Sequence, residues 1–146
     1  MIKLKKLIIL ASFFFSLINF GYSEINLKII IKIDNEIITN YDLEKEANYL
    51  LALNPRLKEI EKKKLMAIAK KSLIKEKIRK NEIIKYKTLD NENSQIETVL
   101  NNLISNLNLE NQEQLQEYFK NFNISIDDIR EKIEIENEWK SLIYAK

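Results

Sequence analysis

The sequence predicts a mainly α-helical protein, with a small N-terminal β-hairpin followed by about five helices that pack as an irregular orthogonal bundle. Three observations lead to this prediction. Apolar residues recur at helical spacing over most of the chain. β-branched residues gather in short runs at one place, the stretch 28–38. Two polar pairs, Thr39 with Asp42 and Ser125 with Asp128, have the spacing of helix caps and precede apolar runs.

The first 23 residues have the pattern of a signal peptide. Lys3, Lys5 and Lys6 precede a predominantly apolar run from Leu7 to Ile18. This run of about a dozen residues is shorter than the roughly 20 that a membrane-spanning helix needs. We therefore expect export, with cleavage after Ser23 and a single domain over residues 24–146. The alternative, an uncleaved segment that tethers the domain to the inner membrane, is less favoured by this length.

The composition excludes most catalytic chemistry. The chain has no Cys and no His, so disulfides, thiol nucleophiles, Ser-His-Asp triads and His-ligated metal sites are excluded. Its one Gly, Gly21, lies in the signal segment, so the domain lacks glycines for a loop that cradles phosphate. We predict a protein that is not an enzyme and has no cofactor and no metal site.

The domain begins with the hairpin and its first helix. Residues 28–38 hold two β-branched runs separated by Asp34-Asn35-Glu36, which are turn formers. Thr39 and Asp42 predict a helix that begins near Asn40. The spacing of its apolar residues places four of them on one face of this helix: Leu43, Ala47, Leu50 and Leu51. The helix is expected to end at Asn54-Pro55, because the residue before a proline disfavours the helical conformation.

Four further helices are predicted. A long one runs from Arg56 to about Tyr86, with apolar residues on more than one face. After the polar break 90–93, the clearest amphipathic pattern spans residues 96–107. A short aromatic helix follows, entered near Asn108 and carrying Leu115, Tyr118, Phe119 and Phe122. The last helix begins at Ile126, after the cap formed by Ser125 and Asp128, and continues to the end of the chain.

The last helix has two apolar faces in succession. Ile126, Ile129 and Ile133 share one face, and a second stripe lies roughly opposite, made of Ile135, Trp139, Leu142 and Ile143. Either the second stripe is buried within the domain, or it docks on a separate partner. Burial within the domain is favoured, because the core is the commoner place for an apolar stripe.

Charge is unevenly distributed. Residues 56–87 carry 13 basic and 4 acidic side chains, net +9, whereas residues 88–146 carry 5 basic and 12 acidic ones, net −7. A basic helix can bind nucleic acid or anionic lipid. We favour a simpler interpretation, in which basic and acidic helices are neighbours, and we expect no nucleic-acid partner because no base-stacking aromatic pattern accompanies the lysines.

The stretch IKIDNEIITNYDLEKEANYL, residues 31–50, resembles the opening of the SurA family of periplasmic chaperones. The resemblance continues through a long helix with the pair Leu73-Ile74, two shorter helices, and a terminal helix written FKNFNISIDDIREKIEIENEWKSLI. It implies a periplasmic domain that binds unfolded outer-membrane or secreted polypeptides. Glu36 stands where relatives usually place Gly. Relatives also continue into parvulin-type prolyl isomerase modules, which depend on His and Gly-rich strands, so isomerase activity is not implied for this chain.

Two functional hypotheses follow. In the first, a shallow apolar groove between helices binds unfolded chains through Tyr49, Met66, Phe119, Phe122 and Trp139. Core positions are favoured for Phe119 and Phe122, and Trp139 is the best candidate for exposure. In the second, the protein is an assembly subunit, and the stripe Ile135, Trp139, Leu142 and Ile143 docks a separate prolyl isomerase. A third hypothesis, an enzyme, is disfavoured because Asp127-Asp128 and the glutamates at 134, 136 and 138 have the positions of cap and surface charges.

Overall fold

The computed structural model describes residues 26–89 and 94–144, so the predicted signal peptide and the polar break at 90–93 lie outside the described residues. The described elements are β1 (Ile29–Ile33), β2 (Glu36–Thr39), α2 (Asn40–Leu53), the 3-10 helix η1 (Pro55–Glu59), α3 (Lys62–Ile83), α4 (Ser94–Asn106), α5 (Gln112–Lys120) and α6 (Ile126–Tyr144). This order confirms the predicted fold class, a hairpin followed by five α-helices. Within the described ranges, no helix is both long enough and apolar enough to cross a bilayer.

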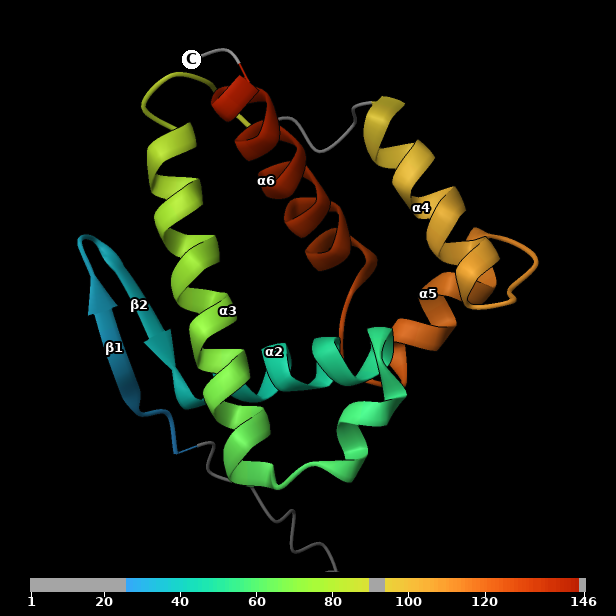
Figure 1. Cartoon of the computed structure of the whole chain (residues 1–146), viewed down its shortest axis with the longest axis horizontal. Helices are drawn as coiled ribbons and strands as arrows, with labels where there is room; N and C mark the ends of the chain where they lie inside the picture. Colours follow the sequence, from blue (N-terminus) through green and yellow to red (C-terminus); the bar gives the residue numbers. More distant parts are fainter. Residues whose placement is uncertain (1–25, 90–93, 145–146) are drawn as a thin grey trace, which may run out of the picture.

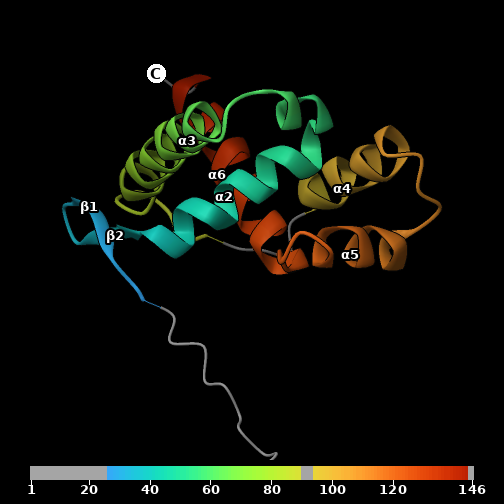
Figure 2. The ribbon, with the colours of Figure 1, turned by 90° about the horizontal axis from the view of Figure 1, so that it is seen from below.

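The helices pack at steep angles to one another (Figure 1). α3 and α6 run side by side, and α2 crosses the lower part of α3 and lies below α6. The hairpin lies on the outer side of α3, whereas α4 and α5 lie on the other side of α6. The view from below shows α2 spanning the molecule from the hairpin to α4 and α5 (Figure 2). The arrangement is therefore the irregular orthogonal bundle that the sequence predicts.

The hairpin joins α2 through the predicted cap. β1 and β2 are antiparallel, with Ile31 opposite Ile38. Asp34, in the connecting turn, has a positive φ of 51°, a conformation that Asp tolerates better than most residues. At the start of α2, the backbone N–H of Asp42 donates to Thr39 Oγ1 (3.2 Å), and the Thr39 N–H donates to Asp42 Oδ2 (2.8 Å). This capping box fixes the direction in which the chain leaves the hairpin.

The prediction of one helix from Arg56 to about Tyr86 is wrong at its beginning. Residues Pro55–Glu59 form a 3-10 turn, and Ile60 then adopts extended backbone before α3 starts at Lys62. Leu57 and Ile60 pack against a small core cluster of Ala47, Leu65 and Ala69 between α2 and α3. A continuous helix would carry the chain away from α2, so this interruption lets α3 turn back against it.

The main core lies where α2, α4, α5 and α6 meet. Its buried residues come from all of these elements and from the turn before α6: Ala52, Ile96, Leu100, Ile104, Leu115, Phe119, Ile124, Ile129 and Ile133. Phe119 is central to it, because its ring stacks near Tyr49 (centroids 6.5 Å apart) and meets the edge of Tyr118 (5.4 Å). The helical periods of 96–107 and of Leu115 with Phe119 therefore correspond to buried positions.

The two apolar faces of α6 follow from its central position. Ile129 and Ile133 belong to the main core, on the side of α4 and α5. Ile135 is buried on the side of α3, where it lines a cavity together with Glu76 and Arg79. Burial within the domain, the favoured alternative, thus accounts for the first residue of the second stripe. The stripe becomes more exposed toward its end, and Ile143 is 53% exposed.

Substitution of Phe119 by Ala tests the core position. Phe119 has no exposed surface, so we expect Phe119→Ala to lower the free energy of unfolding by about 3–5 kcal/mol. Urea denaturation followed by circular dichroism measures this loss. Phe122→Ala is the matched control, since Phe122 is only half-buried against the same cluster and should cost clearly less. Equal, small losses for both variants would contradict the assignment of Phe119 to the core.

Candidate functional site

The structure separates the residues predicted for an apolar groove. Tyr49, Phe119 and Phe122 all belong to the main core or pack against it. Met66 packs against the other cluster, between α2 and α3. Trp139 lies half-buried on α6, with the guanidinium carbon of Arg79 5.6 Å from its ring centroid. Phe119 has no surface on which to bind a ligand, and the five residues do not line one groove.

The cavity between α2, α3 and α6 is mostly charged. It has a volume of about 180 Å³ and a lining that includes Glu46, Glu76, Lys77, Asp128 and Lys132. We call this cavity the central cleft. A neighbouring cavity of about 280 Å³ reaches toward Arg79 and Ile135 and shares four lining residues with it: Glu46, Tyr49, Glu76 and Lys132. The hollow that the helices enclose is thus polar, in contrast to the apolar groove expected from the sequence.

One ammonium group joins the three helices of the central cleft. Lys132 of α6 donates from Nζ to Glu46 Oε2 of α2 (2.6 Å) and to Glu76 Oε2 of α3. The Glu46 side chain is only 1% exposed and that of Lys132 17%. We call these three residues the Lys132 triad. Tyr49 is close to it, with the Lys132 ammonium 4.9 Å from the centroid of its ring.

Helical spacing explains why Lys132 faces the cleft. Asp128, Lys132 and Ile135 recur at i, i+4 and i+7, so they share the face of α6 that meets α2 and α3. Glu46 lies three residues after Leu43 and four before Leu50, within the apolar face of α2. A charged residue inside an apolar stripe was thus the sequence signal for this site. Its partner could not be identified in the same way, because Lys132 lies 86 residues further along the chain.

The charges of the triad are coupled. Burial acts to lower the pKa of Lys132, but the nearby carboxylates of Glu76 and Glu46 and their hydrogen bonds outweigh it, so the pKa lies above its usual 10.5. The pKa of Tyr49 is raised, mainly by its burial. The positive charge of Lys132 acts to lower this pKa, whereas the carboxylates of Glu46 and Glu76 act to raise it further. Two carboxylates share one ammonium, which leaves the triad with one net negative charge. Glu46 Oε1 is buried and accepts no hydrogen bond from any described residue.

A ladder of ion pairs continues between α3 and α6. Lys80 pairs with Glu131 (Nζ to Oε1, 2.6 Å), and Arg79 pairs with Glu136. Beyond the end of α3, Lys87 pairs with Glu138 (2.6 Å). The second half of α3 and the acidic α6 are therefore neighbours, as the simpler interpretation of the charge distribution expects for this part of the chain.

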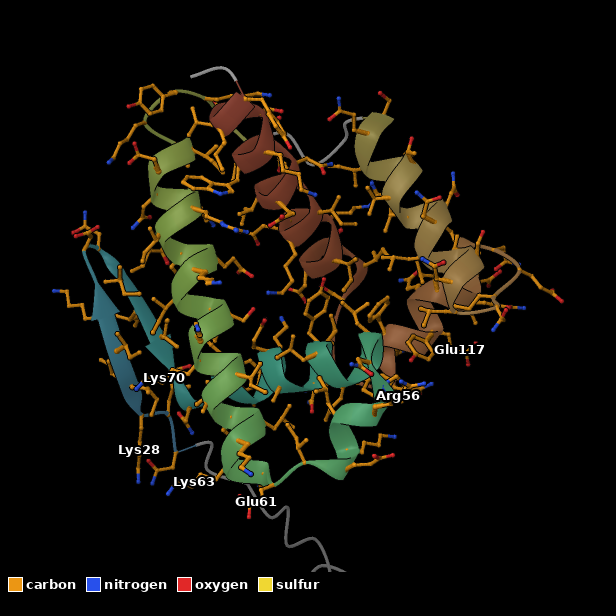
Figure 3. The ribbon with its side chains drawn as sticks, viewed as in Figure 1. Lys28, Arg56, Glu61, Lys63, Lys70 and Glu117 are labelled. Atoms are coloured by element: carbon orange, nitrogen blue, oxygen red, sulfur yellow. The ribbon has the colours of Figure 1, made fainter. Side chains whose placement is uncertain are left out.

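The first half of α3 does not take part in this ladder. Lys63 and Lys70 are exposed and lie at the lower left of Figure 3, outside the contact with α6. These lysines form a solvated face of the helix, and no interaction with α6 explains their presence.

Comparisons with protein-family models, with curated proteins and with solved structures find no match to this chain. Within residues 26–89 and 94–144, no group of three or more acidic side chains is placed to hold a metal ion. The candidate site therefore rests on the geometry of the central cleft and of the exposed surfaces around it.

Removal of the Lys132 ammonium tests its role in holding the three helices. Lys132→Met leaves the buried Glu46 carboxylate without its cation, so we expect a loss of about 3–5 kcal/mol in the free energy of unfolding. Lys140→Met is the matched control, because Lys140 lies on the same helix and is exposed; it should change stability by no more than about 0.5 kcal/mol. Similar small effects of the two substitutions in urea denaturation would show that the triad does not hold α6 in place.

The cap of α6 gives a pH-dependent prediction. Asp128 Oδ2 accepts from the Ser125 N–H (2.9 Å) and Oγ (2.6 Å) and pairs with Lys45 (2.8 Å). Burial acts to raise the pKa of Asp128, but Lys45 and Ser125 outweigh it and hold the pKa below its usual 3.8. A carboxyl whose pKa is lower in the folded state stabilises the protein above its unfolded pKa, and this contribution is lost as the pH falls through the folded value.

We therefore expect Asp128→Asn to cost about 1 kcal/mol of stability at neutral pH. The difference from the wild type should shrink as the pH falls below 3.8. Thermal unfolding between neutral and strongly acidic pH measures both quantities. Asp127→Asn is the control, since Asp127 is exposed and lies one residue away. A stability difference that does not change with pH would rule out the charged cap.

Proposed function

We propose that this protein is an exported, periplasmic chaperone-type domain that binds unfolded outer-membrane or secreted polypeptides and assists their folding. The observation that carries the proposal is the exposure of large apolar side chains on the hairpin, one of two places on the described surface where such side chains form a group. The resemblance of the capped hairpin and of the helix order to the SurA family supports the same function and location. Export would be directed by residues 1–23, with cleavage after Ser23.

The first place is the outer side of the hairpin. We call it the hairpin surface; it consists of Leu27, Ile29, Ile30 and Ile37, all at least 41% exposed. Successive residues of a strand point to opposite faces. Ile38 is therefore buried while Ile37, next to it, faces solvent. In β1 a register shift between Ile29 and Ile31 interrupts this alternation, and the neighbours Ile29 and Ile30 are both exposed. Within the described residues β1 pairs with β2 alone, so its other edge has free backbone groups.

An unfolded outer-membrane protein suits such a surface. Its future barrel strands alternate apolar and polar residues. In extended form, such a segment can place apolar side chains on the isoleucines and bond its backbone to the free edge of β1. Partial burial of a few isoleucines contributes on the order of 1 kcal/mol each. Contacts of this strength are reversible, as the release of a folding polypeptide requires.

The second place is formed by the ends of α3 and α6. We call it the distal surface; it consists of Ile84, Tyr86, Ile143 and Tyr144, the last of which is 88% exposed. It favours the second candidate function, an assembly subunit that docks a separate prolyl isomerase through its last helix. The predicted docking stripe is altered, because Ile135 is buried and Trp139 and Leu142 are half-buried. Ile143 and its neighbour Tyr144 would make most of the contact.

The test is suppression of aggregation. An outer-membrane β-barrel protein is diluted from urea with increasing amounts of the purified protein, and light scattering is followed. We expect the wild type to delay aggregation at a few-fold molar excess. Ile30→Ser combined with Ile37→Ser should raise the required concentration about thirtyfold, which corresponds to about 2 kcal/mol. No delay at several-fold excess would contradict the chaperone proposal.

Matched substitutions on the distal surface serve as the control. Ile143→Ser with Tyr144→Ser removes a comparable number of apolar groups and should leave the aggregation assay unchanged. If these substitutions instead abolish a stoichiometric complex with one separate polypeptide, the assembly function is favoured. Urea denaturation of both double variants checks that stability changes by no more than about 0.5 kcal/mol.

A further inference from the structure

We propose that the central cleft binds one organic cation, a guanidinium or primary ammonium group, as carried by an Arg or Lys side chain of a bound polypeptide. The identity of that polypeptide rests on the proposed function, whereas the cation site rests on the cleft alone. The inference adds a polar, side-chain-specific contact to the apolar contacts of the hairpin surface.

The charge of the cleft favours a cation. Five acidic and three basic side chains line it. The basic groups are already engaged: Lys45 pairs with Asp128 (2.8 Å), and Lys77 pairs with Glu36 (3.0 Å). Glu131 is paired with Lys80, which lies outside the lining, so the excess negative charge comes from the triad and from Asp42. Lys132 alone serves the two carboxylates of the triad. In a buried site with a low effective dielectric, this excess of negative charge attracts a further positive group more strongly than it would in water.

The hydrogen bonding of Glu46 points to the same ligand. Its Oε2 accepts from Lys132 at 2.6 Å, but its Oε1, also buried, accepts from no described group. A buried acceptor without a donor is costly, and more so on a charged group. An N–H donor brought into the cleft would remove this cost and would also neutralise the triad. Neither an anion nor an apolar group would do both.

Size and shape are compatible with this ligand. The cavity of about 180 Å³ corresponds to roughly six water volumes, enough for a guanidinium and part of its alkyl chain. Tyr49 lines the cleft and already faces the Lys132 ammonium, so its ring can also stack with a guanidinium. Oε1 has almost no solvent-accessible surface, so the proposed binding requires Lys132 to shift toward Glu76, its second partner, to let the incoming donor reach Oε1. A guanidinium should bind better than an ammonium, because it is less strongly hydrated and donates in a planar fork.

The experiment uses n-propylguanidinium as the probe and n-propylurea as its neutral counterpart. NMR spectra of the purified protein follow the Tyr49 ring and the Leu73 methyl groups, both of which line the cleft. We expect saturable shifts with propylguanidinium and none with propylurea. Glu46→Gln should weaken binding about tenfold, equivalent to about 1.4 kcal/mol. Glu113→Gln, on the exposed face of α5, should leave it unchanged.

A second variant keeps the proposal testable if Glu46→Gln does not fold. Glu76→Gln changes a carboxylate that is partly exposed, and it leaves Lys132 to neutralise Glu46 alone, so it should also weaken propylguanidinium binding. Equal shifts with propylguanidinium and propylurea, or no saturable shift up to tens of millimolar, would overturn the cation site.

Peptides distinguish the source of the cation. An extended peptide with a single Arg should bind more tightly than the same peptide with citrulline, its neutral counterpart, in place of Arg. Equal binding of both peptides would overturn the assignment to a polypeptide side chain. If the probe does not bind but aggregation is still delayed, the cation site fails and the proposed function stands. If the probe binds but aggregation is not delayed, the proposed function fails and a site for small cations remains.

Discussion

The position of α6 depends on the single ammonium of Lys132, which connects it to Glu46 on α2 and to Glu76 on α3. On its other side, α6 supplies Ile129 and Ile133 to the core that it shares with α4 and α5. One helix thus belongs to both halves of the molecule, and its two buried apolar faces restrict its rotation about its own axis. A buried charge that lacks its partner is costly. The triad therefore reinforces the same rotation of α6, the one that also places the central cleft between the three helices.

Much of the fold could be predicted because the relevant signals are local. The cap formed by Thr39 and Asp42, the stop at Pro55 and the apolar period of 96–107 each act within one or two helical turns. The features that the sequence did not predict depend on residues far apart in the chain. The interruption at Ile60 depends on a cluster shared with α2, and the partner of Glu46 comes from the opposite end of the domain. The groove could not be derived from helix periods, since these give the buried face of each helix but not the angle between two helices.

The positions of the side chains change which residues can bind a polypeptide. Aromatic residues at helical spacing, Phe119 above all, stabilise the core, whereas groups of exposed large apolar side chains lie on the hairpin and at the distal end, with further single ones on α2 and α3. Between these two surfaces is a hollow that is charged. A ligand that touches more than one of these places has to offer both apolar and basic groups along an extended chain. Unfolded polypeptides offer such mixtures, and a folded partner with one smooth apolar face does not.

The direction of α3 and α6 has a consequence for the distal end. The two helices run in the same direction (Figure 1), and Glu76 pairs with Lys132 whereas Lys87, further along the chain, pairs with Glu138. Their C-terminal ends, each carrying partial negative charge from the helix dipole, therefore lie together, and α6 has no basic residue in its last turn. Lys87, just beyond α3, brings a cation toward this end of α6, where it pairs with Glu138. Dissolved ions screen ion pairs at the surface. We therefore expect the last turns of α6, including Tyr144, to be held less firmly as the ionic strength increases.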